Sequence, residues 1–128
     1  VINSDIQTEE YTQKEKLGFL SDVGVRLMKF NEIKKAIAYL EKGLTINERN
    51  ENILNNLAYA YSLNGNYRKS VYYYDQLIAL FPENQQYHYY KGNVLWNMQK
   101  SQLACEEWRI AAELGSDKAR ENAERYCE

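Results

Sequence analysis

Residues that interrupt helices are scarce in this sequence. Only one proline and six glycines occur among its 128 residues. This composition disfavours folds built from short strands and tight turns, and it favours long helices with short connections. The length is that of one domain. No apolar run approaches the roughly 18 to 20 residues that a membrane-spanning helix needs, so we expect no membrane insertion.

Side chains that commonly carry catalysis or bind metals are also few. The chain has a single histidine, His88, and no glycine-rich phosphate loop. No Cys, Asp or second His lies at metal-ligand spacing on its predicted helix, so we interpret His88 as a partly buried packing residue. The acidic pairs Glu9-Glu10 and Glu106-Glu107 are expected in first helical turns, in contact with solvent. The sequence therefore predicts no enzyme, no cofactor and no metal site.

The chain has no large net charge of either sign. Sixteen Lys and Arg residues stand against eighteen Asp and Glu residues, which gives a net charge of -2. Such a chain produces no positive field to attract phosphate backbones, so nucleic acid is not an expected partner. Tyrosine, in contrast, is abundant at twelve residues. Because tyrosine combines apolar area with a polar tip, this excess is typical of binding surfaces.

A period of 34 residues runs from Leu17 to Lys118. Its clearest unit, residues 51–84, divides at Asn64-Gly65-Asn66 into two apolar-periodic halves, which indicates two helices and a tight turn. Small residues recur at the same phase in all three units: Gly24, Ala58 and Gly92 on the first helix, and Ala36, Ser70 and Ala104 on the second. Large residues recur as well: Leu27, Tyr61 and Leu95, and then Leu40, Tyr74 and Trp108. We expect the helices of each unit to touch at the small residues.

The central unit resembles the tetratricopeptide repeat (TPR), which it matches at Leu54, Leu57, Ala58, Tyr61, Tyr67, Ser70, Tyr74, Leu77 and Pro82. This resemblance implies an all-α fold, a right-handed α-solenoid of antiparallel helix pairs with about seven helices. The helices are expected near 9–29, 33–46, 51–63, 67–80, 84–97, 101–114 and 117–126. We predict a single domain that consists of an N-terminal extension of the first helix (1–16), three repeats (17–50, 51–84 and 85–118) and a capping helix (117–128).

The outer units depart from the family pattern at several positions. Glu48 and Ser116 replace the proline, and Gly43 stands where the central unit has Leu77. The third unit lacks the turn glycine, and Ser101 is expected to cap its second helix. Gly115 and Ser116-Asp117 are expected to end that helix and begin the last one. These departures weaken the individual repeats without changing the period.

The first helices of stacked pairs line a concave groove, which suits an extended or helical protein segment. We therefore predict a scaffold that binds a peptide or protein. The predicted groove residues are Ser21, Val25, Met28 and Lys29 in the first unit, Asn52, Asn55, Tyr59, Ser62 and Leu63 in the second, and Gln86, Tyr89, Asn93, Trp96 and Asn97 in the third. Tyr59, Tyr89 and Trp96 are expected as anchors, with Asn55 and Asn93 as backbone clamps. Any of these tyrosines could instead pack between helices.

Some members of this family capture the acidic C-terminus of heat-shock chaperones with Lys, Asn and Arg side chains. Asn56 stands at a matching position, but Ser21, Val25, Gln86 and Tyr90 occupy positions where the basic and remaining amide residues would be needed. The comparison with the family therefore predicts no such clamp here.

Two further possibilities remain open. Tyr72 and Tyr73 lie on the outer side of the second repeat and could support a weak homo-oligomer or docking on a larger assembly. Alternatively, the chain could be a structural spacer or cap from a longer repeat protein, into which residues 1–16 would continue.

Cys105 and Cys127 lie at equal distances from the turn at Ser116, eleven residues on either side. Antiparallel helices packed about 8 to 10 Å apart would bring these residues face to face, within reach of a disulfide. Two small buried thiols are the alternative. The stretch from Ala104 to Cys127 also resembles the C-terminal end of TPR proteins of the bacterial cell envelope, where paired cysteines recur. A disulfide would imply the periplasm or the cell exterior, whereas free thiols leave the cytoplasm open.

Overall fold

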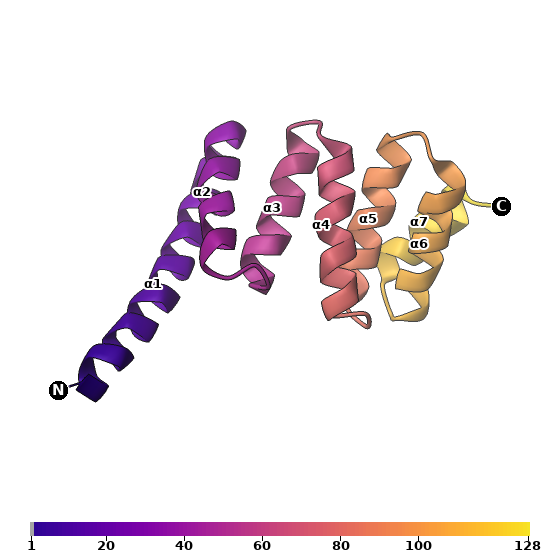
Figure 1. The fold of residues 1–128 in the computed structure, drawn as a ribbon. Helices are drawn as coiled ribbons and strands as arrows, with labels where there is room; N and C mark the ends of the chain where they lie inside the picture. The colour runs from indigo at the N-terminus through magenta and orange to yellow at the C-terminus, as the bar shows by residue number, and fades with distance from the viewer. Residues whose placement is uncertain (1) are drawn as a thin grey trace.

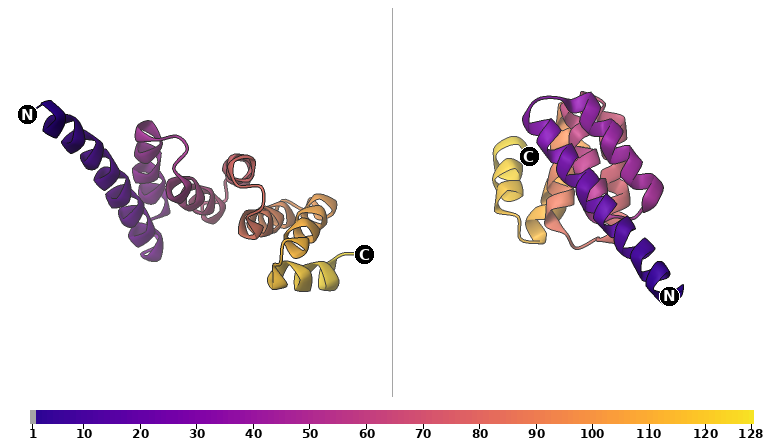
Figure 2. Two further views of the ribbon diagram at one scale, coloured as in Figure 1. Left: turned by 90° about the horizontal axis from the view of Figure 1, so that it is seen from below. Right: turned by 90° about the vertical axis from the view of Figure 1, so that its left-hand side faces the viewer.

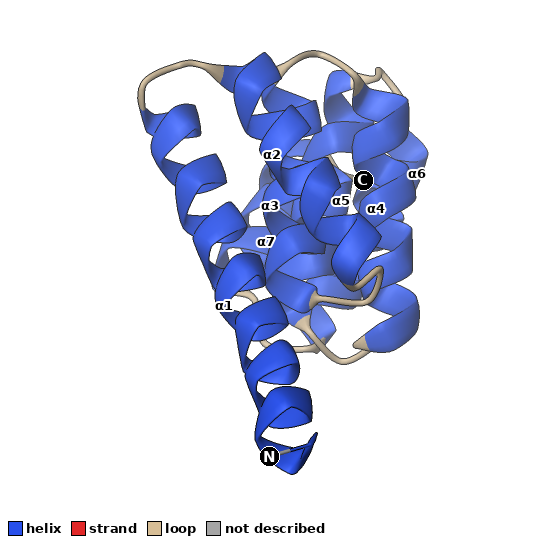
Figure 3. Ribbon diagram, turned by 60° about the vertical axis from the view of Figure 1, so that its left-hand side comes forward, coloured by secondary structure: helices blue, strands red, loops and turns tan. Residues whose placement is uncertain are grey.

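The computed structural model describes the backbone of residues 2–128 and the side chains of residues 12–128. Within these limits it contains seven α-helices and no strand. They are α1 (Ile2–Lys29), α2 (Ile33–Ile46), α3 (Glu51–Leu63), α4 (Tyr67–Leu80), α5 (Gln85–Asn97), α6 (Ser101–Glu113) and α7 (Asp117–Tyr126). The helices lie in a row from α1 to α7, with the two termini at opposite ends (Figure 1). Short loops join them (Figure 3). The prediction of an all-α repeat solenoid is confirmed.

The helix boundaries agree with the predicted ones except at the beginning of the chain. The first helix was expected from residue 9, but α1 begins at Ile2. Neither Gly nor Pro occurs before Gly18, so the added turns contain no residue that strongly disfavours a helix. The N-terminal part of α1 consequently extends beyond α2 and stands away from the stack (Figures 1 and 2).

The turns inside the three helix pairs share one backbone feature. Asn31, Gly65 and Gln99, which are spaced by 34 residues, all have positive φ angles of 62°, 80° and 63°. Gln99 therefore adopts the left-handed conformation that the missing glycine would have provided, at a cost of about 1 kcal/mol. The cap predicted at Ser101 is wrong, because the N-cap position is Lys100 and its side chain makes no capping bond.

Ser116 caps α7 as predicted, and its side chain accepts a hydrogen bond from the backbone N–H of Ala119. Gly115, with a φ of 108°, follows the end of α6. Asparagine side chains perform the same capping role at the start of α3, α4 and α5.

The two helices of each pair come into close contact at the small residues. A Cβ atom on Gly24 would lie 2.7 Å from the Leu40 side chain, and one on Gly92 would lie 2.5 Å from the Trp108 ring. In the central pair, the Ser70 hydroxyl donates to the Ala58 carbonyl at 2.7 Å. The expected contacts between helices at the small residues are therefore confirmed.

Gly43, which stands in the first unit where the central unit has Leu77, also makes room for a large side chain. Gly43 leaves room for Ile53 of the next pair, whose side chain would lie 2.7 Å from a Cβ at that position. The volume lost from one helix is thus filled by its neighbour.

The core is continuous from one pair to the next. Its buried residues form three clusters, the first between α2 and α3, the second across α3, α4 and α5, and the third across α5, α6 and α7. No helix pair has a core of its own, as expected for stacked repeats. None of the helices within residues 2–128 combines the length and apolarity needed to cross a membrane.

We expect Gly92→Ala to destabilise the protein by about 1 to 3 kcal/mol, because the new methyl group would meet the Trp108 ring. Gly18→Ala is the matched control, since no atom lies within 4 Å of the added Cβ. This control should stabilise α1 by about 0.5 to 1 kcal/mol through helix propensity. Urea denaturation measures both variants. Equal effects of the two substitutions would contradict the close-contact interpretation.

Candidate functional site

The central first helix, α3, carries the most accessible part of the predicted groove. Tyr59 and Leu63 are 46% and 47% exposed although both are large and apolar, and they lie one helical turn apart. Asn52 is exposed, and Asn55 is half-buried on the same face. The opposite face of α3 is buried in the core through Ile53, Leu57 and Ala60. The helix therefore presents two apolar side chains beside two amides.

The part of the predicted groove on α5 is more closely packed. The Trp96 ring lies 5.4 Å from the Trp108 ring and 5.3 Å from the Tyr126 ring, measured between centroids. The Asn93 amide oxygen accepts a hydrogen bond from the Trp108 indole at 3.1 Å. Trp96 and Asn93 therefore support the packing of α6 and α7, and only part of each remains available to a ligand.

Other groove positions are also engaged within the protein. Tyr89 contacts Tyr90, whose ring stacks on Tyr74 in the core. The Asn56 side chain donates to the Ser21 hydroxyl at 3.0 Å and so links α3 to α1. Gln86, Asn97 and Lys29 are exposed, and Ser62, Val25 and Met28 are half-buried. Whether these residues bind a ligand stays a prediction.

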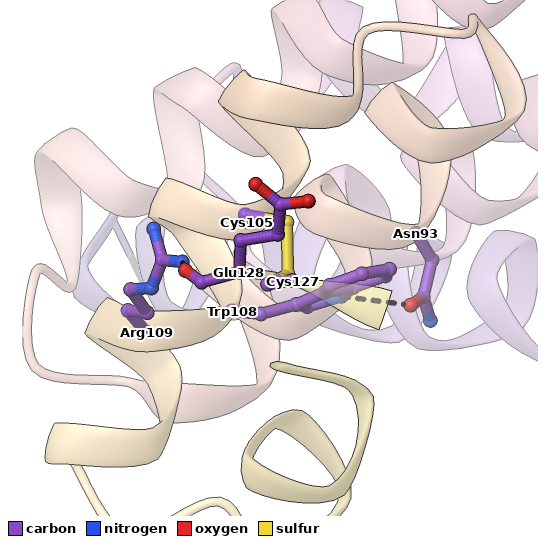
Figure 4. The surroundings of a disulfide bond; sticks show 6 residues. All are labelled: Asn93, Cys105, Trp108, Arg109, Cys127 and Glu128. Atoms are coloured by element: carbon purple, nitrogen blue, oxygen red, sulfur yellow. Dashed lines mark hydrogen bonds between the residues drawn. A yellow bond between two sulfur atoms is a disulfide. The ribbon is translucent and has the colours of Figure 1, made fainter. Parts of the chain in front are cut away.

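The predicted cysteine pair, Cys105 and Cys127, forms a disulfide in the structure, with its Cα atoms 5.9 Å apart. Cys105 lies on α6 and Cys127 directly follows α7, so the bond holds the end of α7 against the stack (Figure 4). The Arg109 side chain adds a 2.7 Å hydrogen bond to the Glu128 carbonyl. Packing adds to these contacts, since Ala119 is buried and the Tyr126 ring of α7 lies 5.3 Å from the Trp96 ring and 6.3 Å from the Trp108 ring.

Sequence reasoning missed a polar network that links α4, α5 and α6. His88, which was predicted to be a partly buried packing residue, is buried, and its two ring nitrogens lie 2.8 Å from the Glu107 carboxylate and 3.1 Å from the Pro82 carbonyl. The Lys91 ammonium lies 2.7 Å from Asp75 and 3.2 Å from Glu107. These partners come from different helices, so no local sequence pattern could reveal them.

The environments of Glu107 and Lys91 differ from what the sequence indicated. The prediction that Glu107 lies in a solvated first turn is wrong, because α6 begins at Ser101 and the Glu107 side chain is only 15% exposed. Burial by itself lowers the pKa of Lys91, but its hydrogen bond to Asp75 and the charge of Glu107 outweigh burial and raise that pKa. The Glu9-Glu10 side chains lie outside the described ones, and their backbone belongs to the third turn of α1.

Several tyrosines belong to the core and not to the groove. Tyr61, Tyr74 and Tyr87 are buried, and burial raises the pKa of each phenol. Tyr61 also donates a hydrogen bond to Glu41, and Tyr87 donates one to Glu51. Tyr59 on α3 and Tyr72 on α4 remain exposed. The abundance of tyrosine therefore reflects both packing and surface.

This geometry defines a helical-repeat protein with an exposed aromatic and amide face. No cluster of three His, Cys, Asp or Glu side chains within residues 12–128 could hold a metal ion. Residues 51–84 match the family model of the tetratricopeptide repeat. No curated protein matches the sequence.

Solved structures share the fold over most of the chain. The first TPR of Spaghetti (RPAP3) bound to the HSP90 peptide SRMEEVD has 19% identity and a TM-score of 0.80, over 88% of this chain and 90% of that chain. The Sgt2 TPR domain from Aspergillus fumigatus has 24% identity and a TM-score of 0.78, over 86% and 76%. The Yersinia enterocolitica chaperone SycD in complex with a peptide of the translocator YopD has 12% identity and a TM-score of 0.76, over 88% and 87%.

The protein therefore has the fold of a tetratricopeptide-repeat domain, and its central unit carries the sequence pattern of that family. The resemblance of the C-terminal stretch to bacterial cell-envelope proteins receives no support from these similarities and stays a prediction.

We expect reduction of the disulfide to lower the free energy of unfolding by about 2 to 4 kcal/mol, since the bond closes a loop with a sequence separation of 22 residues. The measurement is urea denaturation with and without a phosphine reductant. A variant with both Cys105→Ala and Cys127→Ala is the matched control, and its stability should not respond to the reductant. A wild-type protein equally stable in both conditions would show that the bond adds nothing.

Proposed function

We propose that this protein is a scaffold that binds a peptide or protein segment along the first-helix face, with α3 as the main contact. The observation that carries the proposal is the exposed pair Tyr59 and Leu63 beside Asn52 and Asn55. A tyrosine ring and a leucine side chain supply apolar area to a partner. The amides both donate and accept hydrogen bonds, which matches the needs of an extended backbone.

The charge of this face indicates the chemistry of the partner. Lys29 is the one charged side chain in the predicted groove set, which otherwise consists of amides, hydroxyls, aromatic rings and aliphatic side chains. A neutral face attracts ligands through apolar and hydrogen-bonding contacts, so its affinity should depend little on salt. The preferred segment is therefore uncharged where it meets α3 and α5.

Structural neighbours support peptide binding in general terms. The first TPR of Spaghetti is bound to an HSP90 peptide, and SycD forms a complex with a peptide of YopD. We do not propose that this protein binds an acidic peptide. Asn56, which stands at the matching position, already donates its amide to Ser21, and no basic residues stand at the other positions named above.

No catalytic role is proposed. The fold is typically a non-enzymatic interaction module, and the polar network around His88 links three helices of the stack.

We expect Tyr59→Ala and Leu63→Ala each to weaken binding of a selected peptide about tenfold or more, as removal of a central apolar anchor does. The peptide would be selected from a displayed random library on the wild-type protein and measured by calorimetry. Tyr72→Ala, an exposed aromatic substitution on α4, is the matched control and should leave the affinity unchanged.

The peptide SRMEEVD serves as the second probe, and we expect it not to bind. Salt-sensitive binding of SRMEEVD, or equal losses in the Tyr59 and Tyr72 variants, would contradict the proposed neutral groove.

We further propose that the protein works in an oxidising compartment, the periplasm or the cell exterior, because a disulfide joins its cap to the stack. The test is made on protein from its native source. Acid first stops thiol exchange, a maleimide then alkylates the free thiols, and the labels per chain are counted. We expect no labelling without prior reduction. Two labelled thiols per chain would instead place the protein in a reducing compartment such as the cytoplasm.

A further inference from the structure

The first helix leaves open a face that the later first helices bury. Phe19 of α1, Ile53 of α3 and Tyr87 of α5 stand at the same position of the 34-residue period. Ile53 and Tyr87 are 0% and 3% exposed because the preceding helix pair packs on them, whereas Phe19 is 63% exposed. In the right-hand view of Figure 2, α1 lies in front of the other helices at this end of the molecule.

We define the α1 end face as Phe19, Asp22, Arg26 and Phe30. Their spacing of three or four residues places them on one side of the helix. Phe30, directly after α1, is 80% exposed. Asp22 and Arg26 are also exposed, and neither forms an ion pair with another described residue. The face thus combines two open phenyl rings with one charge of each sign.

This face differs from the contacts between repeats. The residues that correspond to Arg26 are Ala60 in α3 and Val94 in α5, and both are buried. A preceding helix pair of the ordinary kind would bury the Arg26 guanidinium at that position without a partner from this chain, which is costly. The end face is therefore unsuited to one more repeat of the same kind.

Stacking of copies end to end is also blocked. At the other end of the molecule α7 covers α6, with Ala119 buried in the same cluster as Trp108 and Ala111. The disulfide holds α7 in place. A second copy consequently finds no free last helix on which to seat its own α1.

We propose that a second copy of this chain covers the α1 end face, with the two α1 helices antiparallel about a two-fold axis. In an antiparallel pair of copies, a residue of one copy lies level with a residue of the other when their two numbers add to a constant sum. Asp22 can then face Arg26 of the second copy, and Arg26 can face its Asp22, as two-fold symmetry requires. Opposed helix dipoles favour the same arrangement.

The exposed rings of Phe19 and Phe30 lie on either side of the two charged residues along the chain, so each copy brings two rings to the contact. The two rings provide apolar area, and the exposed ion pairs fix the register more than they add affinity.

The test is a charge exchange between copies, followed by sedimentation velocity at chain concentrations from about 1 µM to about 1 mM, the range of weak association. The wild type should dimerise within this range. Asp22→Arg and Arg26→Asp should each weaken the homodimer about tenfold, because both reciprocal pairs become like-charged. An equimolar mixture of the two variants should recover the dimer, since each Arg then faces an Asp.

Circular dichroism of each variant checks that its helix content is unchanged, and Tyr72→Ala on the outer side is the control that should dimerise like the wild type. A wild type that stays monomeric at every concentration overturns the proposal. Failure of the mixture to recover the dimer overturns the antiparallel pairing, as does loss of the dimer in the Tyr72 variant. Peptide binding through Tyr59 is measured separately and does not depend on the outcome.

Discussion

The close approach of the two helices of each pair at small residues, which recur every 34 residues, is the constraint on which the rest of this structure depends. Leu40 packs on Gly24 and Trp108 packs on Gly92, each so closely that a Cβ on the glycine would force the large side chain to shift. This contact fixes how closely the two helices of a pair approach. Because the contact recurs with the same period, successive pairs stack in the same way and their first helices turn the same side outward.

The two ends of the stack are finished in different ways. At the C-terminal end the large residue is a tryptophan, which reaches Asn93, Trp96 and Tyr126 and so joins α5, α6 and α7. The covering helix is mostly polar, and the disulfide adds a covalent attachment to the packing of Ala119 and Tyr126. At the N-terminal end no comparable cover lies on Phe19 within the described part of the chain. One end is closed covalently, and the other is open to a partner.

The distribution of charge supports a division between scaffold and binding face. Opposite charges gather between neighbouring helices, where Lys91 joins the exposed Asp75 and the half-buried Glu107, and the buried His88 completes the network. Such groups hold three helices in register because each has partners on the neighbouring helices. The first-helix face is left mostly with amides and apolar side chains, and Tyr59 and Leu63 are its exposed large apolar residues on α3.

The sequence by itself determined the period, the number of helices and most of their boundaries, because these depend on local spacing and on residues 34 apart. It also pointed to the Cys105–Cys127 pair, since two antiparallel helices joined by a short turn have a geometry fixed by residue count. It could not sort the tyrosines into core and surface, nor show that Trp96 and Asn93 serve the packing around Trp108. It also placed Glu107 in solvent. Only the tertiary structure decided these points, because each depends on side chains from three helices meeting at one place, which no periodicity along a single helix records.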